Sequence, residues 1–215
     1  MSNSSSETHC SMCKQPPFIT RPYSGEVLCE QCFRASIEAK VREAISKWQM
    51  LQRTDRIAVA FSGGKDSAAL LSILVENQRR FPESEIIAVT LDEGISAASD
   101  REKIVRTAAQ MLGVELVISS YQELYSVTMD DLVELVRATD YPYSPCVYCG
   151  VMRRQGLNIL ARQLDADKLA FGHCLDDEVQ SMLMNLIRGD VQRLSRLEVP
   201  ADYLDIIFFS RGECN

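Results

Sequence analysis

The 215-residue chain contains no apolar run long enough to cross a lipid bilayer. Its first residues, MSNSSSETH, lack the basic segment and the apolar core of a secretory signal, and we expect residues 1–8 to be a disordered tail. An excess of positive charge is also missing, since the net charge is −7. These absences predict a cytoplasmic protein without membrane contacts. They disfavour a large nucleic-acid-binding surface but leave room for a local basic patch.

Cysteine, by contrast, is frequent. Eight cysteines in a chain without a signal peptide indicate metal or redox chemistry rather than a disulfide framework. Two C-x-x-C pairs stand fifteen residues apart, the spacing of a four-cysteine zinc site; their members are Cys10, Cys13, Cys29 and Cys32. Prolines between the pairs suit the turns of a module too small for its own core. We therefore predict a structural Zn²⁺ ribbon over residues 9–33, stabilised by its metal.

The rest of the chain predicts one α/β domain. Apolar residues at helical spacing from Phe33 to Leu51 indicate a long amphipathic helix, which we expect to link the ribbon to the main domain over residues 34–53. Residues 54–197 then alternate between strands and helices. The expected strands are 57–61, 86–91, 114–118 and 168–171, and the expected helices are 68–75, 104–112, 124–136, 150–164 and 179–187. This order predicts a mostly parallel sheet with helices on both faces.

A glycine-containing loop joins the first strand to the first helix of this domain. Two glycines allow a sharp turn that brings backbone N–H groups against an anion, while the helix start and a lysine add positive charge. The spacing is not that of a Walker A loop. The loop consists of Ser62, Gly63, Gly64, Lys65, Asp66 and Ser67.

Three further segments fall at ends of predicted strands or helices. The turn 92–95 is either a nucleotide contact or a plain capped turn. We expect Cys146 and Cys149 on a loop that opens the next helix, as a redox dithiol, half of a zinc site, or two ligands of an iron–sulfur cluster. Asp176 and Asp177 follow the last strand, where they either hold Mg²⁺ or cap a helix.

The motifs SGGKDS, CVYCG and GHCLDDEVQ, in this order after a zinc ribbon, resemble those of the TtuA-type tRNA 2-thiolation family of PP-loop ATP pyrophosphatases. The resemblance covers about residues 10–197 and implies an adenine-nucleotide α-hydrolase-like fold. The related TtcA-like family, which makes 2-thiocytidine in tRNA, shares the loop and the C-x-x-C pair but generally lacks the ribbon.

This resemblance also implies roles for individual residues. The loop residues 62–67 would bind the phosphates of ATP and Mg²⁺, and the nucleotide pocket would be completed by Ala60, Ile95, Arg153, Gly172 and Asp177. Catalytic roles would fall to Asp66, Asp177, Cys146 and Cys149. The two cysteines would be two of three cysteine ligands of a [4Fe–4S] cluster.

The implied reaction is ATP-dependent sulfur transfer to tRNA. The enzyme would adenylate C2 of a uridine and replace its oxygen with sulfur, which a ubiquitin-like carrier protein commonly delivers. The family resemblance also suggests a homodimer.

The end of the chain departs from the family pattern. The family's third cluster cysteine and second zinc ribbon lie farther downstream than this chain extends, so we expect a C-terminally truncated member with an atypical tail over residues 198–215. Three alternatives remain: TtcA-like 2-thiocytidine synthesis, a PP-loop ligase that uses nitrogen, and a non-catalytic zinc-containing RNA- or protein-binding remnant.

Overall fold

The computed structural model describes residues 9–96, 100–139, 144–173, 175–189 and 207–210. Its contacts divide the chain into two compact units, Met1–Met50 and Leu51–Asn215. None of the described helices combines the length and the apolar character that crossing a lipid bilayer requires.

The first unit is a small ribbon followed by a long helix. Strands β1 (Ile19–Thr20) and β2 (Val27–Leu28) pair antiparallel, and helix α1 spans Glu30–Lys47. The predicted helix start at residue 33 is wrong, because Cys29 caps α1 and its sulfur accepts a hydrogen bond from the Cys32 N–H. Cys32 therefore lies in the first turn of the helix.

The second unit contains a five-stranded sheet in the order β5-β4-β3-β6-β7. The strands are β3 (Arg56–Ala60), β4 (Glu85–Asp92), β5 (Glu115–Ser120), β6 (Lys168–Phe171) and β7 (Ile207–Ser210). The first four are parallel, which confirms the predicted fold class, while β7 pairs antiparallel with β6. Strand β7 was not predicted, since it lies within the segment read as an atypical tail.

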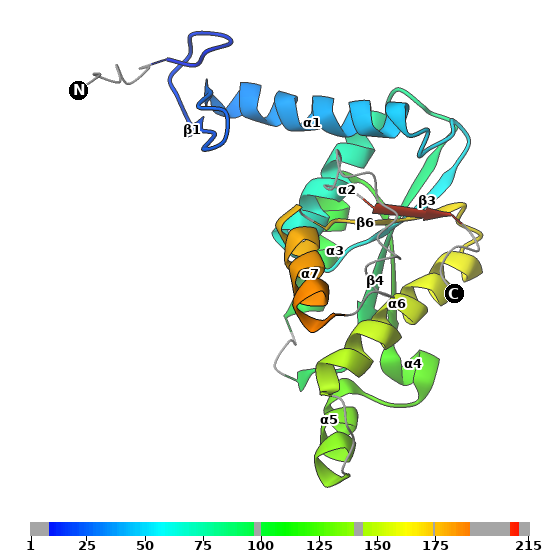
Figure 1. Cartoon of the computed structure of the whole chain (residues 1–215). Coiled ribbons are helices and arrows are strands. Elements are labelled where there is room, and N and C mark those ends of the chain that lie inside the picture. Colours follow the sequence, from blue (N-terminus) through cyan, green and yellow to red (C-terminus); the bar gives the residue numbers. More distant parts are fainter. Residues whose placement is uncertain (1–8, 97–99, 140–143, 174, 190–206, 211–215) are drawn as a thin grey trace. The chain divides into compact units, whose positions relative to one another are not determined.

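Helices flank the sheet on both sides (Figure 1). Helices α2 (Lys65–Gln78) and α3 (Arg101–Leu112) connect β3 to β4 and β4 to β5 on one face. Helix α6 (Pro145–Gln163) returns the chain to β6 on the other face, as right-handed crossovers require. Alternate residues of β4 pack there against α6, in a core that includes Ile87, Val89, Leu91, Leu157 and Leu160. Helix α7 (Leu175–Arg188) follows β6, and the apolar face predicted for it is exposed.

Two helix predictions need correction. The single helix expected over 124–136 is two helices, α4 (Tyr121–Tyr125) and α5 (Met129–Ala138), because Ser126 adopts φ 57° and each helix begins with its own capping box. Helix α6 begins at Pro145, not at residue 150, because proline is favoured in the first turn. Cys146 and Cys149 are consequently helical residues and do not lie on a loop.

Candidate functional site

The loop after β3 is held in one conformation by its own serines. The Ser67 hydroxyl donates to the Gly64 carbonyl at 3.0 Å and lies 3.1 Å from the Ser62 hydroxyl. Gly63 has φ 80°, a conformation that favours glycine. Gly64 caps α2 without any side-chain hydrogen bond, so the first N–H groups of α2 are available to an anion.

The start of the loop is fixed to the sheet. The Phe61 N–H donates to the Val89 carbonyl at 2.8 Å, and the buried Thr90 hydroxyl donates to the Phe61 carbonyl at 2.6 Å. Strand β4 therefore sets the direction in which the chain leaves β3.

A cavity of about 340 Å³ opens at the carboxyl ends of β3 and β6. Chain connections run from β3 towards β4 on one side and arrive at β6 on the other, so this is the topological switch point where α/β sheets bind ligands. Six predicted site residues line the cavity: Ala60, Ser62, Gly64, Ser67, Arg153 and Gly172. Residues 63, 65 and 66 belong to the same loop but are not among the lining residues.

Arg153 connects the cavity to Cys149, the second cysteine of the pair on α6. Its Nε donates to Glu93 Oε1 at 2.9 Å, and its Nη2 donates to Cys149 Sγ at 3.3 Å. Partial burial lowers the pKa of Arg153, but the negative charges of Glu93 and Cys149 outweigh this effect and raise the pKa above its ordinary value. The guanidinium therefore remains a cation between the cavity and the sulfur.

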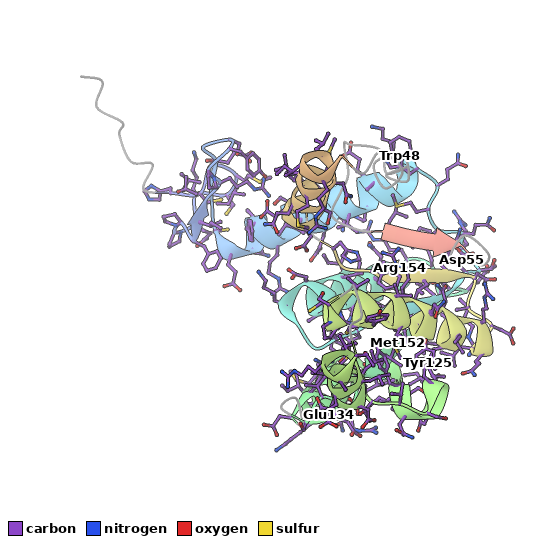
Figure 2. All side chains as sticks on the ribbon, turned by 60° about the horizontal axis from the view of Figure 1, so that its bottom comes forward. Trp48, Asp55, Tyr125, Glu134, Met152 and Arg154 are labelled. Atoms are coloured by element: carbon purple, nitrogen blue, oxygen red, sulfur yellow. The ribbon has the colours of Figure 1, made fainter. Side chains whose placement is uncertain are left out.

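Two tyrosines of α4 hold the first turns of α6. The hydroxyl of the buried Tyr121 donates to the Cys149 carbonyl at 3.0 Å, and the same phenol oxygen lies 3.9 Å from Cys149 Sγ. Tyr125 donates to the Met152 carbonyl at 2.9 Å, and both residues are labelled in Figure 2. Burial raises the pKa of Tyr121, and the neighbouring Cys149 raises it further, so the phenol stays protonated and continues to donate.

Some predicted residues lie away from the cavity. Ile95 packs instead against the core beneath α6, since Gly94 turns the chain with φ 69° and the apolar side chain is drawn inward. Asp177 is an exposed residue in the first turn of α7 and is not among the lining residues. Cys146 is exposed at the start of α6. Cys174 and Cys214, which the sequence left unassigned, fall outside the described residues.

Among the lining residues that were not predicted as site residues, three have ionisable side chains: Glu93, Arg101 and His173. Glu93 lies in the turn 92–95, which the sequence marked as a candidate contact. Its partner Arg153, however, is 60 residues away in the sequence, and the chain gives no local signal for that pairing.

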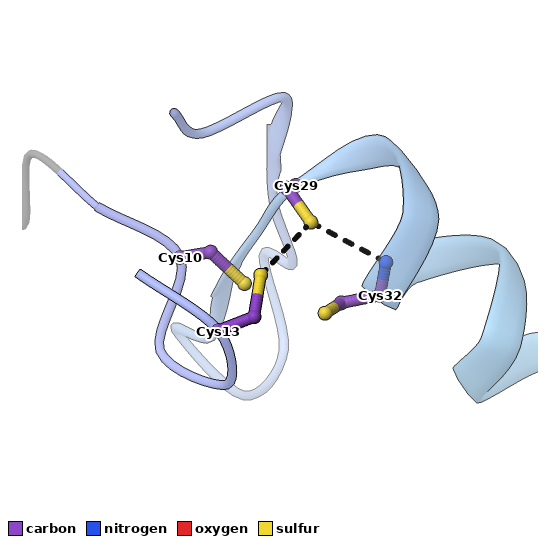
Figure 3. Close-up of side chains that lie close together, drawn as sticks. All are labelled: Cys10, Cys13, Cys29 and Cys32. Atoms are coloured by element: carbon purple, nitrogen blue, oxygen red, sulfur yellow. Dashed lines mark hydrogen bonds between the residues drawn. The ribbon is translucent and has the colours of Figure 1, made fainter. Parts of the chain in front are cut away.

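The four N-terminal cysteines form a separate cluster in the first unit (Figure 3). All four sulfurs lie within 4.8 Å of one another, and tetrahedral Zn–S bonds of about 2.3 Å place sulfurs roughly 3.8 Å apart. Burial raises the pKa of Cys10, but surrounding backbone N–H groups lower it more, to about 6. The donor set and its geometry fit one Zn²⁺ ion.

The cysteine pair on α6 offers fewer metal ligands than the ribbon does. In the described part of the chain, only the ribbon cysteines form a metal-binding group of three or more residues. Cys146 and Cys149 therefore supply two thiols of the right chemistry, fewer than a [4Fe–4S] cluster normally takes from a protein.

The sequence is similar to those of known tRNA 2-thiolation proteins. Cytoplasmic tRNA 2-thiolation protein 1 from Drosophila willistoni is 38% identical over 188 residues, which are 86% of this chain and 54% of that protein. The Dictyostelium discoideum protein of the same name is 36% identical over 190 residues, covering 87% and 52%. The chain thus spans about half the length of these curated relatives.

A solved structure is also similar: the U34-tRNA thiolase NcsA from Methanococcus maripaludis with its [4Fe-4S] cluster. It matches with a TM-score of 0.78 and 30% identity, over 92% of this chain and 65% of that one. The resemblance to tRNA 2-thiolation proteins is thereby confirmed. Residues 34–202 match the profile of the PP-loop domain family. The glycine loop 62–67, the parallel strands and the cavity at the switch point all lie within the matched residues. The chain therefore belongs to the PP-loop domain family.

Proposed function

We propose that this chain carries out ATP-dependent sulfur transfer to C2 of a uridine in tRNA. The observation that carries the proposal is that one residue, Arg153, both lines the cavity beside the glycine loop and donates to Cys149 Sγ. Groups suited to a nucleotide and to sulfur thus lie at one site. The names of the relatives and of the solved thiolase support the same reaction.

In the first half-reaction, the uridine O2 attacks the α-phosphorus of ATP and pyrophosphate leaves. Loop residues 62–67 and the start of α2 bind the phosphates, with Lys65 contributing positive charge and Asp66 an oxygen ligand for Mg²⁺. Ala60, Gly172 and Arg153 contribute walls of the nucleotide pocket, and we retain Asp177 and Ile95 as contacts to be tested.

In the second half-reaction, a sulfide ion attacks C2 and AMP leaves with the former O2, which gives 2-thiouridine without any change of oxidation state. Hydrolysis of the carrier's C-terminal thiocarboxylate releases this sulfide and leaves a carboxylate on the carrier. Cys146 and Cys149 are the proposed residues for binding sulfur. They would be two ligands of an iron–sulfur cluster, which, when bound, would supply an iron atom to which sulfide can coordinate. Tyr121 and Arg153 orient Cys149, whether or not a cluster is bound. The four ribbon cysteines hold a structural Zn²⁺.

The proposal includes partners and a location. tRNA is the substrate, a ubiquitin-like carrier protein delivers the sulfur, the active form is a homodimer, and the reaction takes place in the cytoplasm. The word "cytoplasmic" in the relatives' name supports the location.

The test is product analysis after anaerobic incubation with Mg·ATP, sulfide and tRNA. We expect AMP and pyrophosphate to form only with tRNA, in step with 2-thiouridine. We expect Lys65→Ala to abolish all three products and Cys146→Ala to abolish AMP and 2-thiouridine. Formation of 2-thiocytidine would favour the TtcA-like alternative. AMP formation that persists in Cys146→Ala and Cys149→Ala would favour a ligase that uses nitrogen. Bound zinc without ATP binding would indicate a non-catalytic module.

A further inference from the structure

Glu93 is a buried acid to which the proposed reaction assigns no role. The residue directly follows β4, and its side chain is 4% exposed and lines the cavity. A carboxylate is withdrawn from water at low cost only where cations and hydrogen bonds compensate. Glu93 has both, because Oε1 accepts from Arg153 Nε at 2.9 Å and Oε2 pairs with Arg101 Nη1.

The charge of Glu93 does not itself favour an anionic ligand. A carboxylate in the wall of a pocket repels phosphate, and the repulsion is strong where water is excluded. Glu93 therefore contributes through the groups that it holds. These are two arginines from α3 and α6, the helices on opposite faces of the sheet that meet at the cavity.

The geometry points to Glu93 as a positioning residue that fixes Arg153 between the nucleotide cavity and Cys149, and fixes Arg101 at the same wall. The planar guanidinium of Arg153 is anchored at two points, Nε on Glu93 and Nη2 on the sulfur at 3.3 Å. Two anchors fix the plane of the group, which a single contact would leave free to rotate.

The backbone around Glu93 is rigid enough for this role. Its carbonyl accepts from the Met129 N–H at 2.7 Å, which ties it to the start of α5. The next residue, Gly94, has φ 69°, and a Cβ there would lie 2.8 Å from Thr128 Cβ. The acid is thus held between β4 and α5 while its side chain reaches α3 and α6.

The decisive variant is Glu93→Gln, which keeps the size of the side chain and removes its charge. Glu85→Gln is the matched control, since Glu85 stands at the other end of β4 and pairs with Arg56 at 3.2 Å on the surface. The first readout is the NMR signal of the Arg153 Nε–H, assigned by its loss in Arg153→Ala. We expect a slowly exchanging signal in the wild type and in Glu85→Gln, and a signal broadened by exchange with water in Glu93→Gln.

The second readout separates kcat from KM for ATP, and here the inference rests on the proposed function. We expect Glu93→Gln to lower kcat about tenfold or more, as a misoriented group does, with KM unchanged or lower because a repulsive charge is gone. In a background that carries both Arg101→Ala and Arg153→Ala, which removes both partners of Glu93, the same change has no further effect on kcat. If Glu93→Gln does not fold, Arg153→Lys is the second variant, because it keeps the charge and loses the two-point anchoring of the guanidinium. We expect it to lower kcat about tenfold or more with KM for ATP unchanged, and an unchanged kcat overturns the inference.

An unchanged Arg153 signal in Glu93→Gln overturns the inference. An unchanged kcat also overturns it, as does a loss of kcat that adds to that of the variant lacking both arginines. A wild type that forms no AMP contradicts the proposed function instead, and the NMR readout then decides the role of Glu93 by itself.

Discussion

At the scale of single residues, the site depends on a close approach of two backbones. A Cβ on Gly172, at the end of β6, would lie 2.9 Å from the Asp66 carbonyl oxygen and 3.2 Å from the Ser67 nitrogen. Neither atom belongs to a flexible side chain, so a rotamer change cannot relieve the contact. Glycine at this position allows the start of α2 to reach the cavity.

We therefore predict that Gly172→Ala destabilises the protein by about 1–3 kcal/mol, as overpacking does, and weakens Mg·ATP binding, because the loop must move. Gly150→Ala is the control, since a Cβ there meets nothing within 4 Å and the position is helical. Urea unfolding and calorimetric titration with Mg·ATP measure the two effects. Wild-type stability and affinity in Gly172→Ala would show that the approach is not as tight as described.

At the scale of elements, the connection between β5 and α6 is organised by two capping boxes. Ser120 and Glu123 begin α4, and Thr128 and Asp131 begin α5. These helices matter to the site because α4 supplies Tyr121, which holds Cys149, and the first residue of α5 holds the Glu93 carbonyl. Local capping thus determines where two site residues stand.

The capping carboxylates predict how stability depends on pH. Hydrogen bonds from Thr128 lower the pKa of Asp131, and those from Ser119 and Ser120 lower that of Glu123. A pKa below the unfolded value means stability that is present above about pH 4 and is lost as the pH falls through the folded value. We expect Asp131→Asn to lower the free energy of unfolding at pH 7, with the difference from wild type shrinking towards pH 3. A difference that is independent of pH would contradict the ionised capping role.

At the scale of the whole molecule, two units have separate cores. The core of the first includes Cys10, Leu28 and Cys29, whereas that of the second is built on β4 and α6. Because the described part of the first unit buries few apolar residues, we expect this unit to depend on a bound metal; zinc can contribute on the order of 10 kcal/mol to such a module.

Metal removal is therefore expected to unfold only the ribbon. We predict one zinc per chain at the ribbon by elemental analysis, retained in Cys146→Ser and lost in Cys13→Ser. After chelation, amide signals of residues 9–33 lose their dispersion in NMR spectra while those of β3 to β6 keep theirs. Loss of both sets together would indicate that the second unit cannot fold without the metal.

Local patterns predicted the parallel strands, the glycine loop and the cysteine cluster, because each of these depends on residues close together in the sequence. What could not be predicted depends on distant contacts. Glu93 meets Arg153 only after α6 has crossed the sheet, and β7 becomes a strand only by pairing with β6.

The central claim is that the nucleotide cavity and the cysteine pair belong to one site, in which Arg153 lines the cavity and contacts Cys149. Paramagnetic broadening tests this claim most directly. A fluorine label on Cys146, with Cys149, Cys174 and Cys214 changed to serine and zinc on the ribbon, reports its distance from Mn·ATP. Arg79→Cys places the same label just past the far end of α2, which is about 21 Å long for its 14 residues. We predict that Mn·ATP, but not Mg·ATP, broadens the Cys146 signal severely and the Arg79→Cys signal much less. An unbroadened Cys146 signal at saturating Mn·ATP would contradict the account.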